Sequence, residues 1–196
     1  MKLSILCVTK NEPRAKPFLA DMCLVAEALG AEFVKVVDGT DVHSGGYLES
    51  VLDEAVAMCH GDYVLRLDDD EMIGEDFVDW LSRGEFDSGI YTFPRWNLWG
   101  DEKHYIVNDM LYPDLQTRLT AKELAGGRQT IHSGSPFGIG MVMSFPILHY
   151  KYLVKSYAER KAIAQIYERI VPGAGFGFYK IYSLPEDCTA IRTEEI

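Results

Sequence analysis

The sequence has no apolar run close to the ~20 residues that a membrane-spanning helix needs, so no transmembrane segment is expected. It is also poor in basic residues, because 19 Lys and Arg stand against 30 Asp and Glu, giving a net charge of −11. A protein that binds duplex nucleic acid needs a basic surface, so this charge balance excludes that class. An acidic chain that binds phosphate groups needs a metal ion or a local cluster of cations.

Cysteine is scarce and carries no metal-ligand spacing. The four cysteines are Cys7, Cys23, Cys59 and Cys188, and three of them lie within apolar segments. This pattern indicates reduced, buried thiols rather than disulfides or a zinc site. Residues 1–9 turn polar too soon for a signal peptide. We therefore expect a cytoplasmic protein.

The first 70 residues alternate between strand-like and helix-like patterns. Short β-branched runs predict strands at 2–9, 32–37 and 63–67. Apolar stripes at helical spacing predict helices at 13–29 and 48–60. This alternation is typical of a parallel α/β sheet covered by helices.

The remaining patterns are shorter. They predict strands at 88–93, 104–108, 115–120 and within 141–149, helices at 76–81 and 154–171, an aromatic loop at 96–101 and a glycine-rich loop at 122–140. A length of 196 residues suits one domain with a real core. We expect that domain to cover residues 1–171. The tail at 172–196 has no assigned role, although such segments can close over a substrate as lids.

Four consecutive acids, Asp68 to Glu71, follow the third predicted strand. Open α/β sheets bind ligands at the carboxyl ends of their parallel strands. Four adjacent carboxylates repel one another unless a cation lies among them, so we expect a divalent metal and a diphosphate here. Alternation along an extended chain directs Asp69 away from its neighbours, toward solvent. Glu71 stays open between a water-mediated metal contact and solvent exposure.

Polar residues also follow the first two predicted strands. Thr9, Asn11 and Glu12 come after the first, and Asp38 and Asp41 come after the second. Because the carboxyl ends of parallel strands meet at one edge, these side chains and the four acids are expected to face the same crevice. Such a crevice suits a nucleoside diphosphate.

Three stretches together resemble the family 2 glycosyltransferases of GT-A fold. They are Ser4–Glu12 (SILCVTKNE), Val36–Asp41 (VVDGTD) and Gly61–Glu71 (GDYVLRLDDDE). Tyr112–Leu119 (YPDLQTRL) and Leu148–Tyr152 (LHYKY) are similar to bacterial members that build envelope sugars. The resemblance implies a nucleotide-diphospho-sugar transferase fold, with a Rossmann-like, mostly parallel central sheet flanked by helices.

The resemblance also implies roles for the acids. Asp68 and Asp70 match the family's Asp-x-Asp motif. In the family, the first acid faces the ribose side and the second coordinates Mn²⁺ or Mg²⁺ on the diphosphate, which agrees with the preference of these ions for oxygen ligands. We expect both acids at the metal site, with His149 completing it. Asp38 matches the acid that binds the base, most often uracil.

The same comparison assigns Thr9, Asn11, Glu12 and Asp69 to the nucleotide-sugar pocket, beside Asp38 and Asp68. The function it implies is transfer of a hexosyl or N-acetylhexosaminyl group from a nucleotide-sugar, such as a UDP-sugar, with inversion. The acceptor is a hydroxyl on a glycan, a lipid-linked sugar or a protein.

An inverting transferase needs a carboxylate that deprotonates the acceptor hydroxyl. Asp114 is the candidate base, and Asp109, Glu123 and His132 are alternatives. Four basic residues stay open between phosphate contacts and solvated surface charges: Arg118, Arg128, Lys151 and Lys155.

Two other functions fit the same fold. One is a nucleotide- or sugar-binding module that has lost catalysis. The other is a sugar nucleotidyltransferase, although such enzymes carry a glycine-rich basic loop after the first strand. Lys10–Pro13 is not such a loop.

Overall fold

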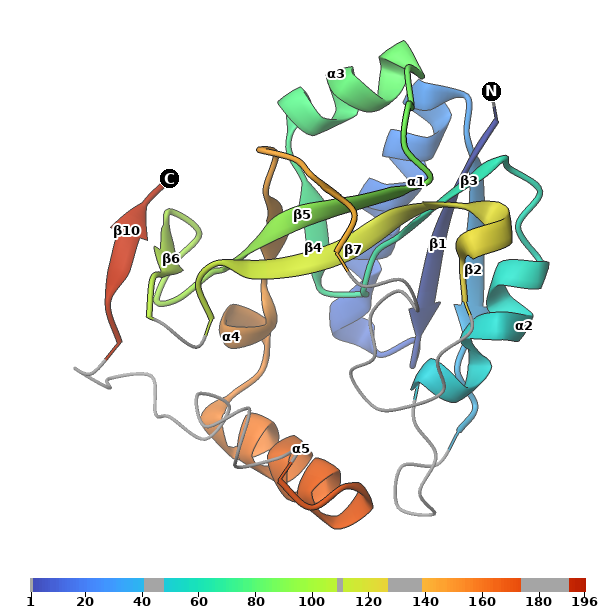
Figure 1. Cartoon of the computed structure of the whole chain (residues 1–196). Coiled ribbons are helices and arrows are strands. Elements are labelled where there is room, and N and C mark those ends of the chain that lie inside the picture. The colour runs from blue at the N-terminus through green and yellow to red at the C-terminus, as the bar shows by residue number, and fades with distance from the viewer. Residues whose placement is uncertain (1, 41–47, 109–110, 127–138, 174–190) are drawn as a thin grey trace.

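The computed structural model describes residues 2–40, 48–108, 111–126, 139–173 and 191–196 (Figure 1). The helices are α1 Lys16–Leu29, α2 Leu52–Ala57, α3 Glu75–Arg83, α4 Lys151–Val154 and α5 Tyr157–Ile170. The strands are β1 Leu3–Thr9, β2 Glu32–Val37, β3 Tyr63–Arg66, β4 Glu71–Ile73, β5 Ile90–Asn97, β6 His104–Ile106, β7 Asp114–Ala121, β8 Met141–Val142, β9 Ile147–His149 and β10 Thr193–Glu195. Among these residues, none of the helices combines the length and the apolar character that a bilayer crossing requires.

The central sheet has eight strands in the order β2-β1-β3-β7-β5-β9-β4, with β8 beside β5. β1 runs parallel to β2 and β3, whereas β7 is antiparallel to both β3 and β5. β5 therefore runs in the same direction as β3, and β8 and β9 are parallel to β5. Only β7 and β4 oppose the others within this sheet. The predicted α/β fold with a mostly parallel central sheet is confirmed.

Helices cover both faces of the sheet. In Figure 1, α1 and α3 lie on one side of β1 and α2 lies on the other. Alternate residues of β1 point to opposite sides, so Ile5 packs with α1 and α3, and Leu6 packs with α2. α1 follows a short 3-10 turn that begins at Pro13, and it ends at Gly30, whose φ of 59° is the left-handed conformation common after helices. The predicted first helix is thus confirmed, and its buried face forms much of the larger core.

The chain approaches β1 very closely at Gly61. Its backbone N–H donates to Ser4 Oγ at 2.8 Å, and a Cβ at this position would lie 2.5 Å from the Ser4 backbone nitrogen. Only glycine fits there. Ser4 Oγ in turn donates to Glu32 Oε2 at 2.6 Å, and Glu32 also accepts from the backbone N–H of His60 at 2.7 Å. Glu32 therefore ties β2 to β1 and to the segment that enters β3.

We expect these contacts of Glu32 to make part of the free energy of unfolding depend on pH. Some burial opposes ionisation, but hydrogen bonds from Ser4 and His60 outweigh it and lower the pKa of Glu32 from 4.5 to about 2. A carboxyl with a depressed folded pKa stabilises the fold above its unfolded pKa, and that contribution is lost as the pH falls through the folded pKa. The difference in urea midpoint between the wild type and Glu32→Gln should therefore shrink from pH 6 to pH 2. Glu85→Gln, at an exposed position, serves as the control. A difference that does not vary with pH would contradict the prediction.

Several predicted boundaries were wrong. The acids at 68–70 form a turn, and Glu71 opens a strand, β4, that was not predicted. Residues Trp96 and Asn97 belong to β5 rather than to a loop. The predicted helix at 154–171 begins later, at Tyr157, because Ser156 caps α5 in a capping box with Glu159, and Val154 is instead the last residue of α4.

The last described residues pack against β6. β10 pairs antiparallel with β6, and the backbone N–H of Ile196 donates to Lys103 O at 2.8 Å. Most of the predicted tail, residues 174–190, lies outside the described residues. A lid role for the tail stays a prediction.

Candidate functional site

The four acids lie in a turn that crosses one edge of the sheet. β3 is third in the sheet order and β4 is seventh, so the chain passes the ends of β7, β5 and β9 between them. Two hydrogen bonds hold the turn in place. Leu67 N–H donates to Leu6 O at 3.0 Å, and Asp68 N–H donates to Glu71 Oε2 at 2.9 Å. Because of this path, side chains from several strands reach the acids.

Two arginines hold Asp68 and Glu71. Arg118 Nη2 lies 2.5 Å from Asp68 Oδ2 and 2.5 Å from Glu71 Oε1, and Arg95 Nη1 lies 3.3 Å from the same Glu71 oxygen. Glu71 is 0% exposed and Arg118 is 2% exposed. Burial opposes the charge on Asp68, but Arg118, Arg66 and Arg95 outweigh it and hold the pKa of Asp68 well below its usual range. The cations that these two carboxylates need are therefore protein side chains.

A β-bulge aims Arg118 at the turn. In the pairing of β5 with β7, Tyr91 lies opposite Leu119 and Thr92 lies opposite Thr117. Arg118 is thus an extra residue with none opposite. Bulges bend a strand and redirect side chains, which explains how a strand residue reaches acids on a crossing turn.

Two of the basic residues that the sequence left open are buried, and a third is largely buried. Arg118 and Lys151 are 2% and 8% exposed, and the side chain of Lys155 is 16% exposed. Burial and the neighbouring Lys155 lower the pKa of Lys151 to about 7. The interpretation as solvated surface charges is wrong for these three, and phosphate contacts stay a prediction. Arg128 lies outside the described residues.

Thr9 links the loops that follow β1, β2 and β3. Its hydroxyl donates to Asp69 Oδ2 and accepts from Asn11 N–H at 2.8 Å, and its carbonyl accepts from Asp38 N–H at 2.8 Å. Asp38 is 5% exposed and pairs with Lys10 Nζ at 2.9 Å. Burial opposes ionisation of Asp38, but hydrogen bonds from Thr40 and Lys10 lower its pKa. Thr9, Asn11, Asp38 and Asp69 therefore meet at one edge.

The expectation that Asp69 faces solvent was wrong. Asp69 is half-buried against Thr9, and burial together with the charge of Asp70 raises its pKa. The alternation argument failed because residues 69–70 form a turn rather than an extended strand. Its assignment to the nucleotide-sugar pocket stays a prediction.

Asp70 and His149, 79 positions apart in the sequence, face each other. His149 Nε2 lies 3.4 Å from Asp70 Oδ1, and Lys155 Nζ donates to Asp70 Oδ2 at 2.9 Å. Burial opposes ionisation of Asp70, but the charge of Lys155 outweighs it and holds the pKa of Asp70 well below its usual range. Burial and the charge of Arg95 lower the pKa of His149. The structure thus brings together two of the three predicted metal ligands, and Asp68 lies two residues away on the same turn.

Asp114, the candidate base, is the first residue of β7. Arg95 Nε donates to its Oδ2 at 2.8 Å, Asn97 Nδ2 to the same oxygen at 3.0 Å, and Gln116 Nε2 to its Oδ1 at 2.6 Å. Burial pushes its pKa up, but these three donors, Arg95 foremost, lower it overall. Asp114 is therefore a firmly ionised carboxylate that accepts three hydrogen bonds.

Glu12 forms an ion pair with a residue outside the acid turn. Its Oε2 pairs with Arg14 Nε at 2.5 Å, and Arg14 also reaches Glu159 on α5 at 2.7 Å. Among the alternatives for the base, Glu123 lies in a 3-10 turn after β7. Asp109 and His132 lie outside the described residues, as does Asp41 of the second loop.

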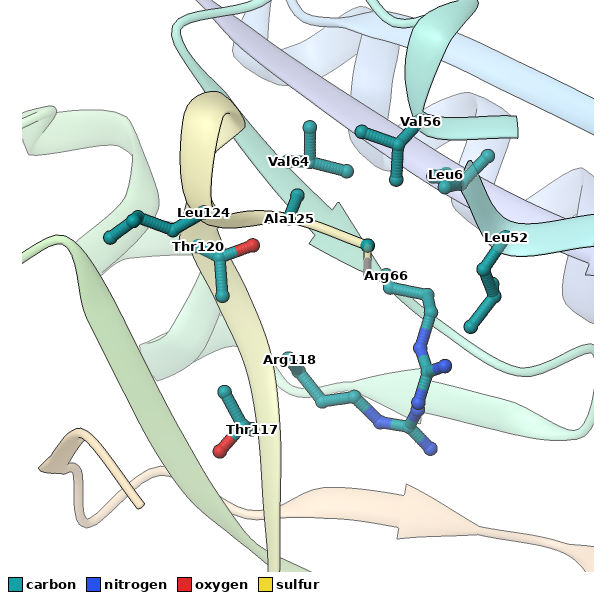
Figure 2. A pocket seen from close by; sticks show the side chains of 11 residues that line it. Leu6, Leu52, Val56, Val64, Arg66, Thr117, Arg118, Thr120, Leu124 and Ala125 are labelled. Atoms are coloured by element: carbon teal, nitrogen blue, oxygen red, sulfur yellow. The ribbon is translucent and has the colours of Figure 1, made fainter. Parts of the chain in front are cut away.

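A small pocket lies beside the acid turn, lined by residues of α2, β3 and β7. In Figure 2 the side chains of Arg66 and Arg118 extend toward one another at one end, and Leu6, Val56 and Val64 line the other. The cavity volume is about 40 Å³, room for about three water molecules.

Sequence reasoning missed Arg95 and Asn97, because the stretch around Trp96 was interpreted as a loop. Two signals point to them. Arg95 and Asn97 are two apart, so both face the same side of a strand. A run of four carboxylates at a sheet edge also predicts buried cations elsewhere in the chain.

The ligand atoms that Asp70 and His149 offer determine whether a divalent ion suits the site between them. Asp70 Oδ1 and His149 Nε2 offer an oxygen and an imidazole nitrogen, both of which Mn²⁺ accepts. In the part of the chain that the structure describes, no three or more His, Cys, Asp or Glu side chains are grouped to enclose a metal ion. Mg²⁺ is commonly held by one or two carboxylates together with substrate phosphates. Two protein ligands therefore fit an ion that is bound together with a diphosphate.

No family model matches the sequence, and a comparison with curated protein sequences gives no match. Solved structures with a related arrangement include TarS 1–349 of S. aureus, with a TM-score of 0.44 and 10% identity over 86% of this chain and 66% of that one. A glycosyltransferase involved in glycosylating the major capsid of PBCV-1 gives 0.41 and 13%, over 63% and 61%. HddC from Yersinia pseudotuberculosis gives 0.38 and 8%, over 76% and 73%. The chain thus spans about two thirds or less of the first two, and likenesses at this level assign neither a family nor an activity to it.

Proposed function

We propose that this protein is a metal-dependent glycosyltransferase that moves a sugar from a nucleotide-sugar, such as a UDP-sugar, to a hydroxyl acceptor with inversion. The observation that carries the proposal is the meeting of Asp70 with His149 at the edge of the sheet where Asp38 and Thr9 also lie. The resemblance in the sequence named these four residues from separate stretches. A purely structural acid turn gives no reason for them to converge.

In the proposed site, Thr9, Asn11 and Asp38 bind the base and ribose. Asp68 faces the ribose, and Asp69 lies beside it. Thr9 supports this arrangement, since it contacts both the Asp38 loop and Asp69. Glu12, which points toward α5 through Arg14, has less support as a ligand.

Departure of a nucleoside diphosphate builds negative charge that the protein must stabilise. Asp70 and His149, with Asp68 nearby, would hold Mn²⁺ or Mg²⁺, which supplies Lewis-acid stabilisation of the leaving diphosphate. Lys155 Nζ lies 2.9 Å from Asp70 Oδ2 and supplies further positive charge, and Lys151 is buried close by. Asp114 stays the candidate base for the acceptor hydroxyl, which belongs to a glycan, a lipid-linked sugar or a protein.

The test is the thermal stability of the protein with UDP and Mn²⁺. At about 100 times its Kd, a ligand adds about 2.7 kcal/mol to stability. For a domain of this size that raises the Tm by about 5–10 °C. We expect the shift only when UDP and Mn²⁺ are both present. A complete panel of nucleoside diphosphates that gives no shift with metal would sink the proposal.

One observation favours an inactive binding module as a second candidate. The oxygens of Asp114 accept hydrogen bonds from Arg95, Asn97 and Gln116, which weakens it as a base. Release of UDP from UDP-GlcNAc by the purified protein distinguishes the two. The module would show the thermal shift but would release no UDP, even slowly.

A further inference from the structure

A chain of close polar contacts runs from Asp114 through Asn97 and His149 to Asp70. Asn97 Nδ2 donates to Asp114 Oδ2 at 3.0 Å, and Asn97 Oδ1 lies 2.6 Å from His149 Nδ1. His149 Nε2 lies 3.4 Å from Asp70 Oδ1. Asn97 and His149 are 1% and 3% exposed, so little water is available to replace these partners.

The strand register explains the alignment. Asn97 lies opposite His149 in the pairing of β5 with β9, and Glu71 lies opposite His149 in the pairing of β4 with β9. Arg95 lies opposite Asp114 in the pairing of β5 with β7. Paired residues share a face of the sheet, and Arg95 and Asn97 are two apart on one strand. All five side chains therefore project from one face, held by backbone pairing.

The chemistry of Asp114 fixes the direction of this chain. An ionised carboxylate only accepts hydrogen bonds, and Arg95 and Gln116 already donate to Asp114. The amide of Asn97 must therefore turn its NH₂ toward Asp114 and its oxygen toward His149. An amide oxygen is also only an acceptor, so the facing His149 Nδ1 must carry a proton. In the neutral ring, this leaves the lone pair on Nε2, directed at Asp70.

We propose that Asn97 is a positioning residue, which, anchored by Asp114, fixes the Nδ1–H tautomer of His149 and keeps the Nε2 lone pair aimed at Asp70. A lone pair facing a carboxylate oxygen is unfavourable unless a cation lies between them, and this is how a metal-ligating histidine is usually prepared by its other ring nitrogen. The proton on Nδ1 follows from the contacts alone. The use of Nε2 as a metal ligand rests on the proposed function.

The first test reads the tautomer directly in the metal-free protein. Histidine labelled with ¹⁵N distinguishes Nδ1–H from Nε2–H by its NMR shifts, and His149→Gln identifies the His149 signals. At about pH 8, above the ordinary imidazole pKa, we expect the wild type to show Nδ1–H. A neutral Nε2–H ring or a doubly protonated ring would overturn the inference.

Two substitutions at Asn97 then separate orientation from packing. Asn97→Leu keeps the size but removes the acceptor, so His149 should change to Nε2–H and donate to Asp70. Asn97→Asp keeps an acceptor on Nδ1 and should retain Nδ1–H, although it faces Asp114 with a like charge. If Asn97→Leu keeps Nδ1–H, the positioning role is refuted.

The second readout is Mn²⁺ affinity in the presence of UDP, measured by calorimetry. Loss of a partner that orients a ligand typically costs 10–100-fold in metal affinity. We expect a loss of about that size in Asn97→Leu and a smaller one in Asn97→Asp. A changed tautomer with unchanged Mn²⁺ affinity would refute Nε2 as a ligand, and with it the proposed metal site, while the positioning of His149 by Asn97 would stand.

Discussion

Replacement of Arg118 by methionine should lower the free energy of unfolding by about 3–5 kcal/mol, because removing one partner of a buried ion pair leaves the other charge uncompensated. Arg118 is 2% exposed and serves both Asp68 and Glu71 at 2.5 Å. A whole domain is stable by only about 5–15 kcal/mol. The loss should therefore be plain in urea unfolding followed by circular dichroism.

Two further variants show where the loss comes from. Arg83→Met changes an exposed arginine on α3 and should stay within about 0.5 kcal/mol of the wild type. Adding Glu71→Gln to Arg118→Met removes one of the stranded charges, so part of the loss should return as a coupling energy. A loss below about 1 kcal/mol in Arg118→Met would show that Arg95 alone can neutralise the acids.

Asp70→Asn should abolish the thermal shift given by UDP with Mn²⁺ and lower transferase activity by more than about 100-fold. Changes to residues that merely orient ligands already cost 10–100-fold, and Asp70 would be a ligand itself. The amide keeps the shape of the side chain but loses the charge that pairs with Lys155 at 2.9 Å. Differential scanning fluorimetry and a UDP-release assay measure the two effects.

Loss of UDP and Mn²⁺ binding must be separated from loss of stability, because Asp70→Asn leaves the Lys155 ammonium without the carboxylate charge that it pairs with. The double variant Asp70→Asn with Lys155→Met removes both charges. It should recover much of the stability and still show no shift with UDP and Mn²⁺. Asp79→Asn, exposed on α3, is the matched control and should behave as the wild type. A normal shift in Asp70→Asn would remove Asp70 from the metal site.

The fold was predictable where local signals agree with the tertiary structure. Pro13 marks the turn before α1, and Gly30 marks the end of that helix. The β-branched runs of β1 and β2 lie between turn residues. The second half of the chain was harder to predict, because some of its strands have only two or three residues and pair with strands that are distant in the sequence. β4 follows the acids at once, and no local pattern marks a strand that is stabilised mainly by its pairing with β9.

The acids and His149 of the site were predictable, because they lie in the stretches that together resemble a known family. The cations of the site were not, because they depend on register. Whether Arg95 and Asn97 face the acids depends on the pairing of β5 with β7 and β9. The direction of the Arg118 side chain depends on a bulge, which shifts the strand register by one residue. The alternation of apolar and polar residues in the sequence does not reveal such a bulge.

The path of the acid turn across the sheet edge also sets the order in which the molecule can fold. Asp68 is 50 residues from Arg118, and Asp70 is 85 residues from Lys155. At a synthesis rate of 5–20 residues per second, about 4–17 s pass between the emergence of Asp70 and that of Lys155. During that interval the segment from β1 to β3 carries adjacent carboxylates without their counter-ions. The part of the sheet formed by β1, β2 and β3 is therefore not a self-sufficient folding unit, and it is completed only when the later strands and α4 have joined it.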